Sequence, residues 1–169
     1  PADFLLSVCA NSCPCGYYPM DKCRCTYRQI VKYQNRISGP ILDRIDLFVR
    51  CEEIGYEALT SNSKEESSAD IRKRVSKEIQ KERFAQSTTL FNGRMNKNEV
   101  EIYCKLDEEG QQLMKEAFSV FQLTGRSYFK ILKVARTIAD LEGSYDIKSR
   151  HVEEALYFRQ KGEGRVKVR

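Results

Sequence analysis

Residues 36–49 are Arg-Ile-Ser-Gly-Pro-Ile-Leu-Asp-Arg-Ile-Asp-Leu-Phe-Val, and this stretch joins a turn to the start of a β-rich run. The Ser-Gly-Pro of residues 38–40 predicts the turn, because glycine and proline interrupt regular structure. Residues 41–46 predict a short helix or turn, and residues 47–51, which are apolar except for Arg50, predict a buried strand. Arg44 lies at this junction, so we expect it to reach out of its own subunit.

The residues before this stretch also predict an α/β arrangement. Residues 4–10, Phe-Leu-Leu-Ser-Val-Cys-Ala, are short and apolar, which is typical of a fully buried strand of an α/β sheet. A loop rich in Cys, Pro and Gly follows over residues 11–25. Thr26 can then cap a helix that reaches about Asn35.

The rest of the chain predicts helices. Polar residues 60–68 mark a boundary, and helices are expected over 68–84, 107–121, 126–141 and 149–160, while 99–105 is ambiguous. The expected inward-facing residues recur at helical spacing: Ile71, Val75, Ile79 and Phe84, then Leu113, Met114, Ala117, Phe118 and Phe121, then Ile131, Val134, Ala135 and Ile138, and finally Val152, Ala155, Leu156 and Phe158.

We therefore predict part of an α/β domain over residues 1–60, a helical bundle over 61–160 and a basic tail over 161–169. Inside the bundle we expect a structural pair between Arg136 and Asp140, and a structural role for the single histidine, His151.

Composition excludes some classes of protein. The chain has 169 residues, and 29 basic against 24 acidic side chains give a net charge of +5, interleaved rather than gathered into one run. This charge is compatible with nucleic-acid binding without demonstrating it. The sequence has neither an apolar run of about 18 residues nor the features of a signal peptide, so we expect a cytoplasmic protein. The absence of an initial Met and the early apolar run lead us to expect a fragment of a longer protein.

Four of the seven cysteines, Cys13, Cys15, Cys23 and Cys25, fall within thirteen residues as Cys-x-Cys, seven residues, Cys-x-Cys. Four thiolates can close a tetrahedral zinc site and pin a loop that has few apolar residues. We favour structural zinc. Free reduced thiols and disulfides formed on handling are the alternatives, and four ligands leave no open position for a catalytic metal.

Several motifs occur in a characteristic order: Asn-x-Cys-Pro-Cys-Gly-Tyr from residue 11, Cys-x-Cys from 23, the stretch 36–47, and Arg-Ser-Tyr-x-x-Ile-Leu-x-Val-Ala-Arg-Thr-Ile-Ala-Asp-Leu from 126. Together they resemble the C-terminal half of magnesium-chelatase-like AAA+ ATPases of the bacterial ComM (YifB) type. The resemblance covers nearly all of residues 3–160. It implies the end of an ATPase core followed by a helical lid with a magnesium-chelatase C-terminal signature.

The resemblance also implies site residues. Arg44 corresponds to an arginine finger that reaches ATP in the neighbouring subunit, Asn11 to sensor 1, and Arg126 to a sensor 2 that contacts the γ-phosphate. Each residue has an ordinary alternative: an ion pair with a flanking acid for Arg44, the start of a turn for Asn11, and an exposed helix arginine for Arg126. The family usually has Pro after the sensor Asn, whereas this chain has Ser12, so the exit of the loop is expected to be less rigid.

The sequence has no Gly-x-x-x-x-Gly-Lys-Ser/Thr and no apolar run that ends in Asp-Glu. We therefore do not expect the fragment alone to hydrolyse ATP. For the parent protein the resemblance implies ATP and Mg²⁺, a hexameric ring, and DNA branch migration in competence or recombination. The alternatives are chelatase-type remodelling of a metal-inserting partner, or a zinc-stabilised nucleic-acid-binding module without ATPase activity.

Overall fold

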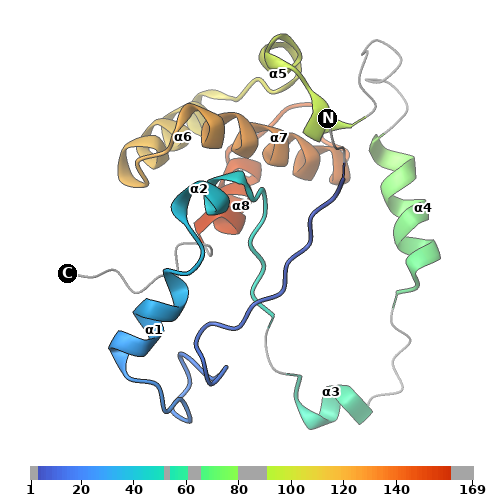
Figure 1. Cartoon of the computed structure of the whole chain (residues 1–169). Helices are drawn as coiled ribbons and strands as arrows, with labels where there is room; N and C mark the ends of the chain where they lie inside the picture. Colours follow the sequence, from blue (N-terminus) through green and yellow to red (C-terminus); the bar gives the residue numbers. More distant parts are fainter. Residues whose placement is uncertain (1–3, 52–53, 61–65, 80–90, 161–169) are drawn as a thin grey trace. The chain divides into compact units, whose positions relative to one another are not determined.

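A computed structural model describes residues 4–51, 54–60, 66–79 and 91–160 (Figure 1). The chain divides into two compact units, and the division falls between Arg44 and Ile45. The described part of the first unit is residues 4–44, and that of the second extends to residue 160 with the gaps named above.

The first unit contains two short helices, α1 (Tyr27–Gln34) and α2 (Gly39–Arg44). As predicted, α1 begins after Thr26, whose hydroxyl oxygen accepts a hydrogen bond from the backbone N–H of Gln29. The Gln29 side chain in turn accepts a hydrogen bond from the Thr26 backbone N–H at 2.8 Å, which completes a capping box. α2 begins two residues earlier than the short helix or turn expected over 41–46.

The two strands expected over residues 4–10 and 47–51 are not present as strands in the described part of the chain. Both segments lack regular structure, and their apolar side chains other than half-buried Phe48 are exposed, with Leu5 at 95% and Val49 at 71%. An apolar run becomes a strand only when another strand pairs with its backbone, and neither described segment has such a partner. The backbone N–H of Phe48 instead donates to the carbonyl oxygen of Phe158, at 2.9 Å.

From Tyr56 onward, the described part of the second unit is mainly helical, as predicted for residues 61–160. In chain order it contains α3 (Tyr56–Thr60), α4 (Ser68–Ile79), the 3₁₀ turn η1 (Asn92–Arg94), α5 (Lys97–Tyr103), α6 (Glu108–Val120), α7 (Gly125–Leu141) and α8 (Ser149–Gln160). The three helices expected after residue 106 are confirmed within one residue at each end, and α5 resolves the ambiguous segment as helical. The predicted end of the α4 segment near Phe84 lies outside the described residues.

The core of this unit forms where α8 packs against α6 and α7 (Figure 1). Most of the residues predicted to face inward do so. Of these, the buried residues are Met114, Ala117, Ile131, Ala135, Val152, Ala155 and Leu156, and Leu113, Phe121, Val134 and Ile138 pack against them partly buried. The same core also contains Met95, Val100, Cys104, Leu132, Ala139 and Ile147, which were not predicted. In the described part of the chain, no helix combines the length and the apolar character that crossing a membrane requires.

Three predictions of burial were wrong. Phe118 is 43% exposed, and on α4 Ile71 and Val75 are 41% and 38% exposed. Phe118 lies at the edge of the core, where its ring makes an edge-to-face contact with Tyr128 with the ring centroids 6.5 Å apart. The positions of Ile79 and Phe84 as core residues fall outside the described side chains.

A buried polar network fixes the C-terminal end of α7. Arg136 Nε lies 3.0 Å from Asp140 Oδ1, as predicted from their spacing, and both side chains are buried. The two terminal nitrogens of Arg136 donate to the carbonyl oxygens of Ser144 and Tyr145, each at 2.6 Å. Asn92 donates to the other oxygen of Asp140 at 2.7 Å. Because each buried charge is paired, the network can hold the α7–α8 loop without an uncompensated charge.

His151 has a structural role at the start of α8, as expected. Its side chain is buried, and Nδ1 accepts a hydrogen bond from the backbone N–H of Lys148 at 2.9 Å. The other ring nitrogen contacts a carboxylate oxygen of Glu142. Because Nδ1 is the acceptor, the ring proton lies on Nε2 and is donated to Glu142.

Candidate functional site

Arg44 is the last residue of α2, and its side chain is exposed. Its Nη1 donates a hydrogen bond to the carbonyl oxygen of Pro40, one turn earlier, at 2.7 Å. Of the two acids that flank it in the sequence, Asp46 pairs with Lys130 of α7 at 2.9 Å. The guanidinium group thus lies on the surface at the end of a short helix.

Asn11 is exposed and follows directly after the extended segment that ends at residue 10. Its side-chain amide lies beside the backbone of Gly16, where an added Cβ would lie 3.7 Å from Asn11 Nδ2. The next residue is fixed at two points: the Ser12 hydroxyl donates to the carbonyl oxygen of Tyr18, and the Ser12 carbonyl accepts from Gln34 Nε2 at 3.0 Å. Proline has no hydroxyl and could not donate to Tyr18. Ser12 therefore connects this segment to the cysteine loop by a bond that proline would lack.

Arg126 is the second residue of α7 and is exposed. The hydroxyl oxygen of Thr124 accepts a hydrogen bond from the backbone N–H of Ser127 at 3.2 Å and thereby caps the helix. A capped first turn fixes the backbone from which Arg126 projects. The guanidinium group and the positive end of the helix dipole both favour an anion here. Arg126 belongs to the second unit, whereas Asn11 and Arg44 belong to the first.

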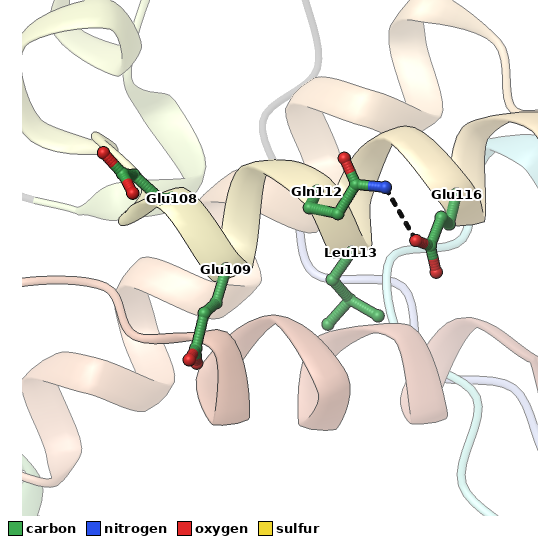
Figure 2. Close-up of a pocket in the computed structure, with 5 residues that line it drawn as sticks. All are labelled: Glu108, Glu109, Gln112, Leu113 and Glu116. Carbon is green, nitrogen blue, oxygen red and sulfur yellow. Dashed lines mark hydrogen bonds between the residues drawn. The ribbon is translucent and has the colours of Figure 1, made fainter.

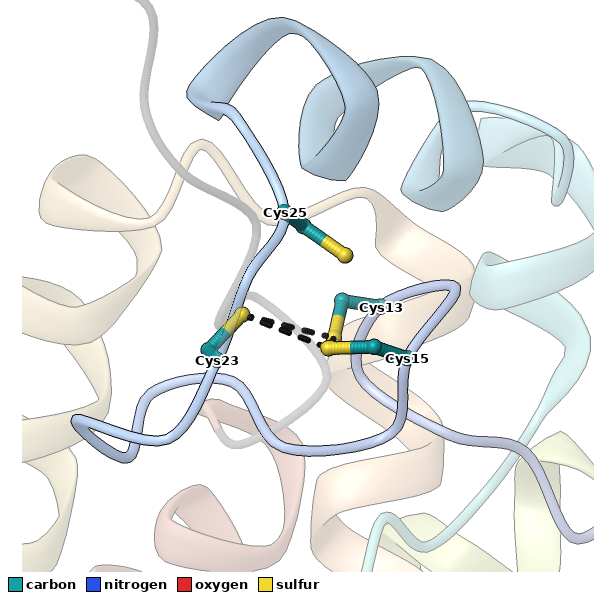
Figure 3. Close-up of side chains that lie close together, drawn as sticks. All are labelled: Cys13, Cys15, Cys23 and Cys25. Atoms are coloured by element: carbon teal, nitrogen blue, oxygen red, sulfur yellow. Dashed lines mark hydrogen bonds between the residues drawn. The ribbon is translucent and has the colours of Figure 1, made fainter.

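The four cysteines of the loop converge, as Figure 3 shows. The sulfur of Cys13 lies 3.4 Å from that of Cys15 and 3.8 Å from that of Cys23, and the sulfurs of Cys15 and Cys23 are 3.6 Å apart. The Cys25 sulfur completes the group, in which all four sulfurs lie within 4.8 Å of one another. This group of ligand atoms can hold a metal ion.

The loop backbone is shaped to bring these sulfurs together. Gly16 has a φ of +85°, a conformation that side-chain-bearing residues rarely adopt, and its N–H donates to the carbonyl oxygen of Cys13 at 3.1 Å. This turn closes the Cys-Pro-Cys-Gly segment. The backbone N–H of Tyr18 points at the Cys13 sulfur from 3.3 Å, which favours a negative charge on that sulfur.

Thiol pKa values in the cluster diverge. Backbone hydrogen bonds from Tyr17 and Arg24 lower the pKa of Cys15 to about 6. A backbone hydrogen bond from Cys15 lowers the pKa of Cys25, but burial and the neighbouring thiols outweigh it and raise the value to about 12. Like charges this close cannot all form unless a cation offsets them, so the first thiolate discourages the others.

Arg159 was not predicted from the sequence, and it ties residues 45–48 to α7 and α8. From the last turn of α8, its two terminal nitrogens donate to the Ile45 carbonyl oxygen at 2.7 Å and to the Ser127 hydroxyl oxygen at 3.0 Å. Its guanidinium carbon lies 5.9 Å from the centre of the Phe48 ring. A basic residue in the last turn of a helix is common, so nothing in the local pattern marked it as special.

A shallow hollow on α6 contains none of the predicted site residues. It is lined by Glu108, Glu109, Gln112, Leu113 and Glu116 (Figure 2). Gln112 Nε2 donates to Glu116 Oε1 at 2.8 Å, and the Ser149 hydroxyl donates to Glu109 at 3.1 Å. Three carboxylates make this hollow unsuited to a nucleotide phosphate.

Two family profiles match the chain one after the other. The first 59 residues match the family described as magnesium chelatase, subunit ChlI, and residues 65–159 match magnesium chelatase, subunit ChlI C-terminal. The second match alone covers more than half of the chain and includes α4 to α8 up to residue 159.

Curated relatives are similar over nearly the whole chain. The competence protein ComM of Haemophilus influenzae is 38% identical over 162 residues, which are 94% of this chain and 31% of that protein. An uncharacterized protein, YifB, of Salmonella typhimurium is 36% identical over 160 residues, with the same two shares. An uncharacterized protein of Mycobacterium bovis is 29% identical over 164 residues. The chain thus spans about a third of the length of these relatives.

Proposed function

Because this chain belongs to the magnesium chelatase family as a ComM-type, AAA+-type member, we propose that it forms the C-terminal part of a ring-forming ATPase. The observation that carries this proposal is the exposure of Arg44 at the end of α2, in the stretch that the family shares. In a ring, an arginine in that position serves the ATP held by the adjacent subunit, where it stabilises charge on the transferred phosphoryl group.

Two further residues complete the proposed ATPase role. Asn11 acts as sensor 1 and orients the attacking water, a task that needs a polar group on a fixed backbone. Arg126 acts as sensor 2: it contacts the γ-phosphate of its own subunit and couples the lid to the nucleotide state. The capped first turn of α7 supports this role, since it fixes the backbone at Arg126.

In this proposal, successive parts of the sequence have different roles. Residues 1–60 belong to the ATPase core, 61–160 form the lid and 161–169 a basic tail. ATP and Mg²⁺ bind in the longer protein, whose phosphate-binding elements this sequence does not include. The cysteine cluster contributes structure rather than chemistry, because four thiolates leave no position open for a reacting group.

For the work done by the ring, we propose DNA branch migration by a hexamer. The competence protein ComM of H. influenzae, the relative described above, supports this choice by its name. The description of the matched family favours the second candidate, chelatase-type remodelling of a partner that inserts a metal.

Replacement of Arg44 in the full-length protein tests the ATPase proposal. In Arg44→Ala, ATP binding should stay within about threefold while turnover falls by about 10³-fold, because the finger acts on the transition state rather than on the bound ground state. Arg44→Lys should recover little, since an ammonium group cannot reproduce the bidentate fork. Arg36→Ala is the matched control: it removes another exposed arginine of the same unit, one that lies over the Tyr33 ring.

Mixed rings show whether the residue acts across subunits. Subunits that carry Arg44→Ala should regain turnover when mixed with subunits that cannot bind ATP but keep Arg44. Unchanged turnover in Arg44→Ala rings, or a loss equal to that of Arg36→Ala, would reject the assignment.

A further inference from the structure

The sulfur positions in the cysteine loop match a metal site and not a set of disulfides. The sulfur–sulfur distances among Cys13, Cys15 and Cys23 run from 3.4 to 3.8 Å. A tetrahedral site with Zn–S bonds of about 2.3 Å places its sulfurs about 3.8 Å apart, whereas a disulfide requires about 2.05 Å. All seven cysteines are unbridged.

The first unit has little else to hold it together. Between residues 4 and 44, Cys13 and Ile30 are the buried residues. A loop with so small an apolar core gains much from a cross-link, and metal binding to a small unit contributes directly to its folding. Cys13 is both a member of this small core and one of the four sulfur donors. A metal bound by Cys13 would therefore be attached directly to the buried part of the unit.

The donor set selects the kind of metal. Four thiolates favour zinc or another thiophilic metal over magnesium or calcium, which prefer oxygen ligands. Lys22 and Arg24 flank Cys23 in the sequence and add positive charge beside a site that would carry two net negative charges when Zn²⁺ is bound.

The cluster is also continuous with Asn11. Cys13 follows Asn11 by two residues, and the Gly16 backbone in the same turn lies beside the Asn11 side chain. The Ser12 hydroxyl donates to the Tyr18 carbonyl oxygen, on the far side of that turn. The turn over residues 13–16, which contains two of the four cysteines, therefore restricts the position of the Asn11 side chain.

We propose that Cys13, Cys15, Cys23 and Cys25 bind one structural Zn²⁺ and that this ion positions Asn11. The second half of this inference rests on the sensor role proposed for Asn11, and the first half stands without it. Asn11 and the metal are joined through the loop backbone, so the metal acts on turnover only by holding a neighbouring group.

Metal content tests the site itself. Full-length protein purified with reductant should contain one more zinc per chain than the Cys23→Ser, Cys25→Ser double variant, and Cys9→Ser should keep the parent value because Cys9 is exposed and outside the cluster. Equal zinc content in parent and double variant would overturn the site. If the double variant does not fold, two measurements on the parent protein test the site. Co²⁺ exchanged into the parent should give thiolate-to-cobalt absorption. Four thiols of the parent should become reactive only after the metal is removed with a chelator.

Turnover tests the link to Asn11. Protein stripped with a chelator, desalted and supplied with Mg²⁺ should bind ATP within about threefold of the parent, but hydrolyse it at least about tenfold more slowly, and zinc should restore the rate. Full turnover in stripped protein, with slow turnover in Asn11→Ala, would overturn the positioning claim. Normal turnover in Asn11→Ala would instead overturn the sensor role and the positioning claim together, while metal content still decides the site.

Discussion

Arg126 occupies a position that helix electrostatics disfavour. It lies in the first turn of α7, next to the positive end of the helix dipole, and its side chain is exposed. A cation at this end gains nothing from the helix unless an anion shares the space. A phosphate group would satisfy both the guanidinium group and the first N–H groups of the helix.

We predict that Arg126→Ala in the full-length protein raises the KM for ATP and lowers kcat, each by about tenfold, because a phosphate contact and the lid coupling are lost together. Steady-state ATP hydrolysis measures both constants. Arg150→Ala is the control, since Arg150 is an exposed arginine in the first turn of α8 and pairs with Glu142 at 2.5 Å. Equal effects of the two replacements would assign Arg126 to the lid surface only.

Residues whose partners are close in sequence could be predicted, and those with distant partners could not. The Thr26 cap and the Arg136–Asp140 pair follow from spacings of three and four residues. Arg159 and Ile45 are separated by 114 residues. The convergence of four sulfurs was predictable because all lie in one short loop, although their distances were not.

At the scale of elements, α7 and the segments 4–10 and 47–51 show why one prediction held and another did not. The 17 residues of α7 carry an apolar stripe and a cap that specify a helix without help from elsewhere. A strand has no such independence, because its hydrogen bonds come from other strands. The apolar run at residues 4–10 therefore indicates a propensity to form a strand, but it does not provide the second strand with which this one would pair.

The contact between α7 and α8 also has a charged component. Glu142 follows the last residue of α7, and hydrogen bonds from His151 and then Arg150 of α8 lower its pKa. A carboxyl whose pKa is lower in the folded protein stabilises the fold at pH values above its unfolded pKa, near 4.5. That stabilisation is lost as the pH falls through the lowered, folded value.

We predict that Glu142→Gln lowers the Tm at pH 7 and that the difference from the parent disappears at a pH below the folded pKa of Glu142. Thermal unfolding, followed by circular dichroism at a series of pH values, measures this difference in Tm. Glu154→Gln, an exposed change on α8, should have no such pH-dependent difference. A Tm difference for Glu142→Gln that stays constant with pH would show that its charge is not responsible.

At the scale of the whole molecule, the two units differ in how they are stabilised. Among the residues that the structure describes, the second unit has a core of thirteen buried apolar residues, whereas residues 4–44 bury two. The relatives are about three times as long as this chain. We propose that the exposed apolar segments of the chain complete a sheet in the longer protein.

Hydrogen exchange checks this proposal. In the chain of 169 residues, the backbone amides of residues 4–10 should exchange rapidly, because the segment is exposed and has no strand beside it. In the full-length protein the same amides should be protected by at least about 10²-fold if they enter a sheet. Amides in the middle of α7 provide the internal control, with similar protection in both proteins. Rapid exchange of residues 4–10 in the longer protein would leave the segment outside any sheet.

The hydrogen bond from Arg159 to the Ile45 carbonyl oxygen links the backbone beside Arg44 to two helices. One peptide bond separates Ile45 from Arg44, so the root of the proposed finger is tethered to α8 and, through Ser127, to the helix that carries Arg126. Any movement that α7 and α8 share would therefore also displace the backbone at Ile45.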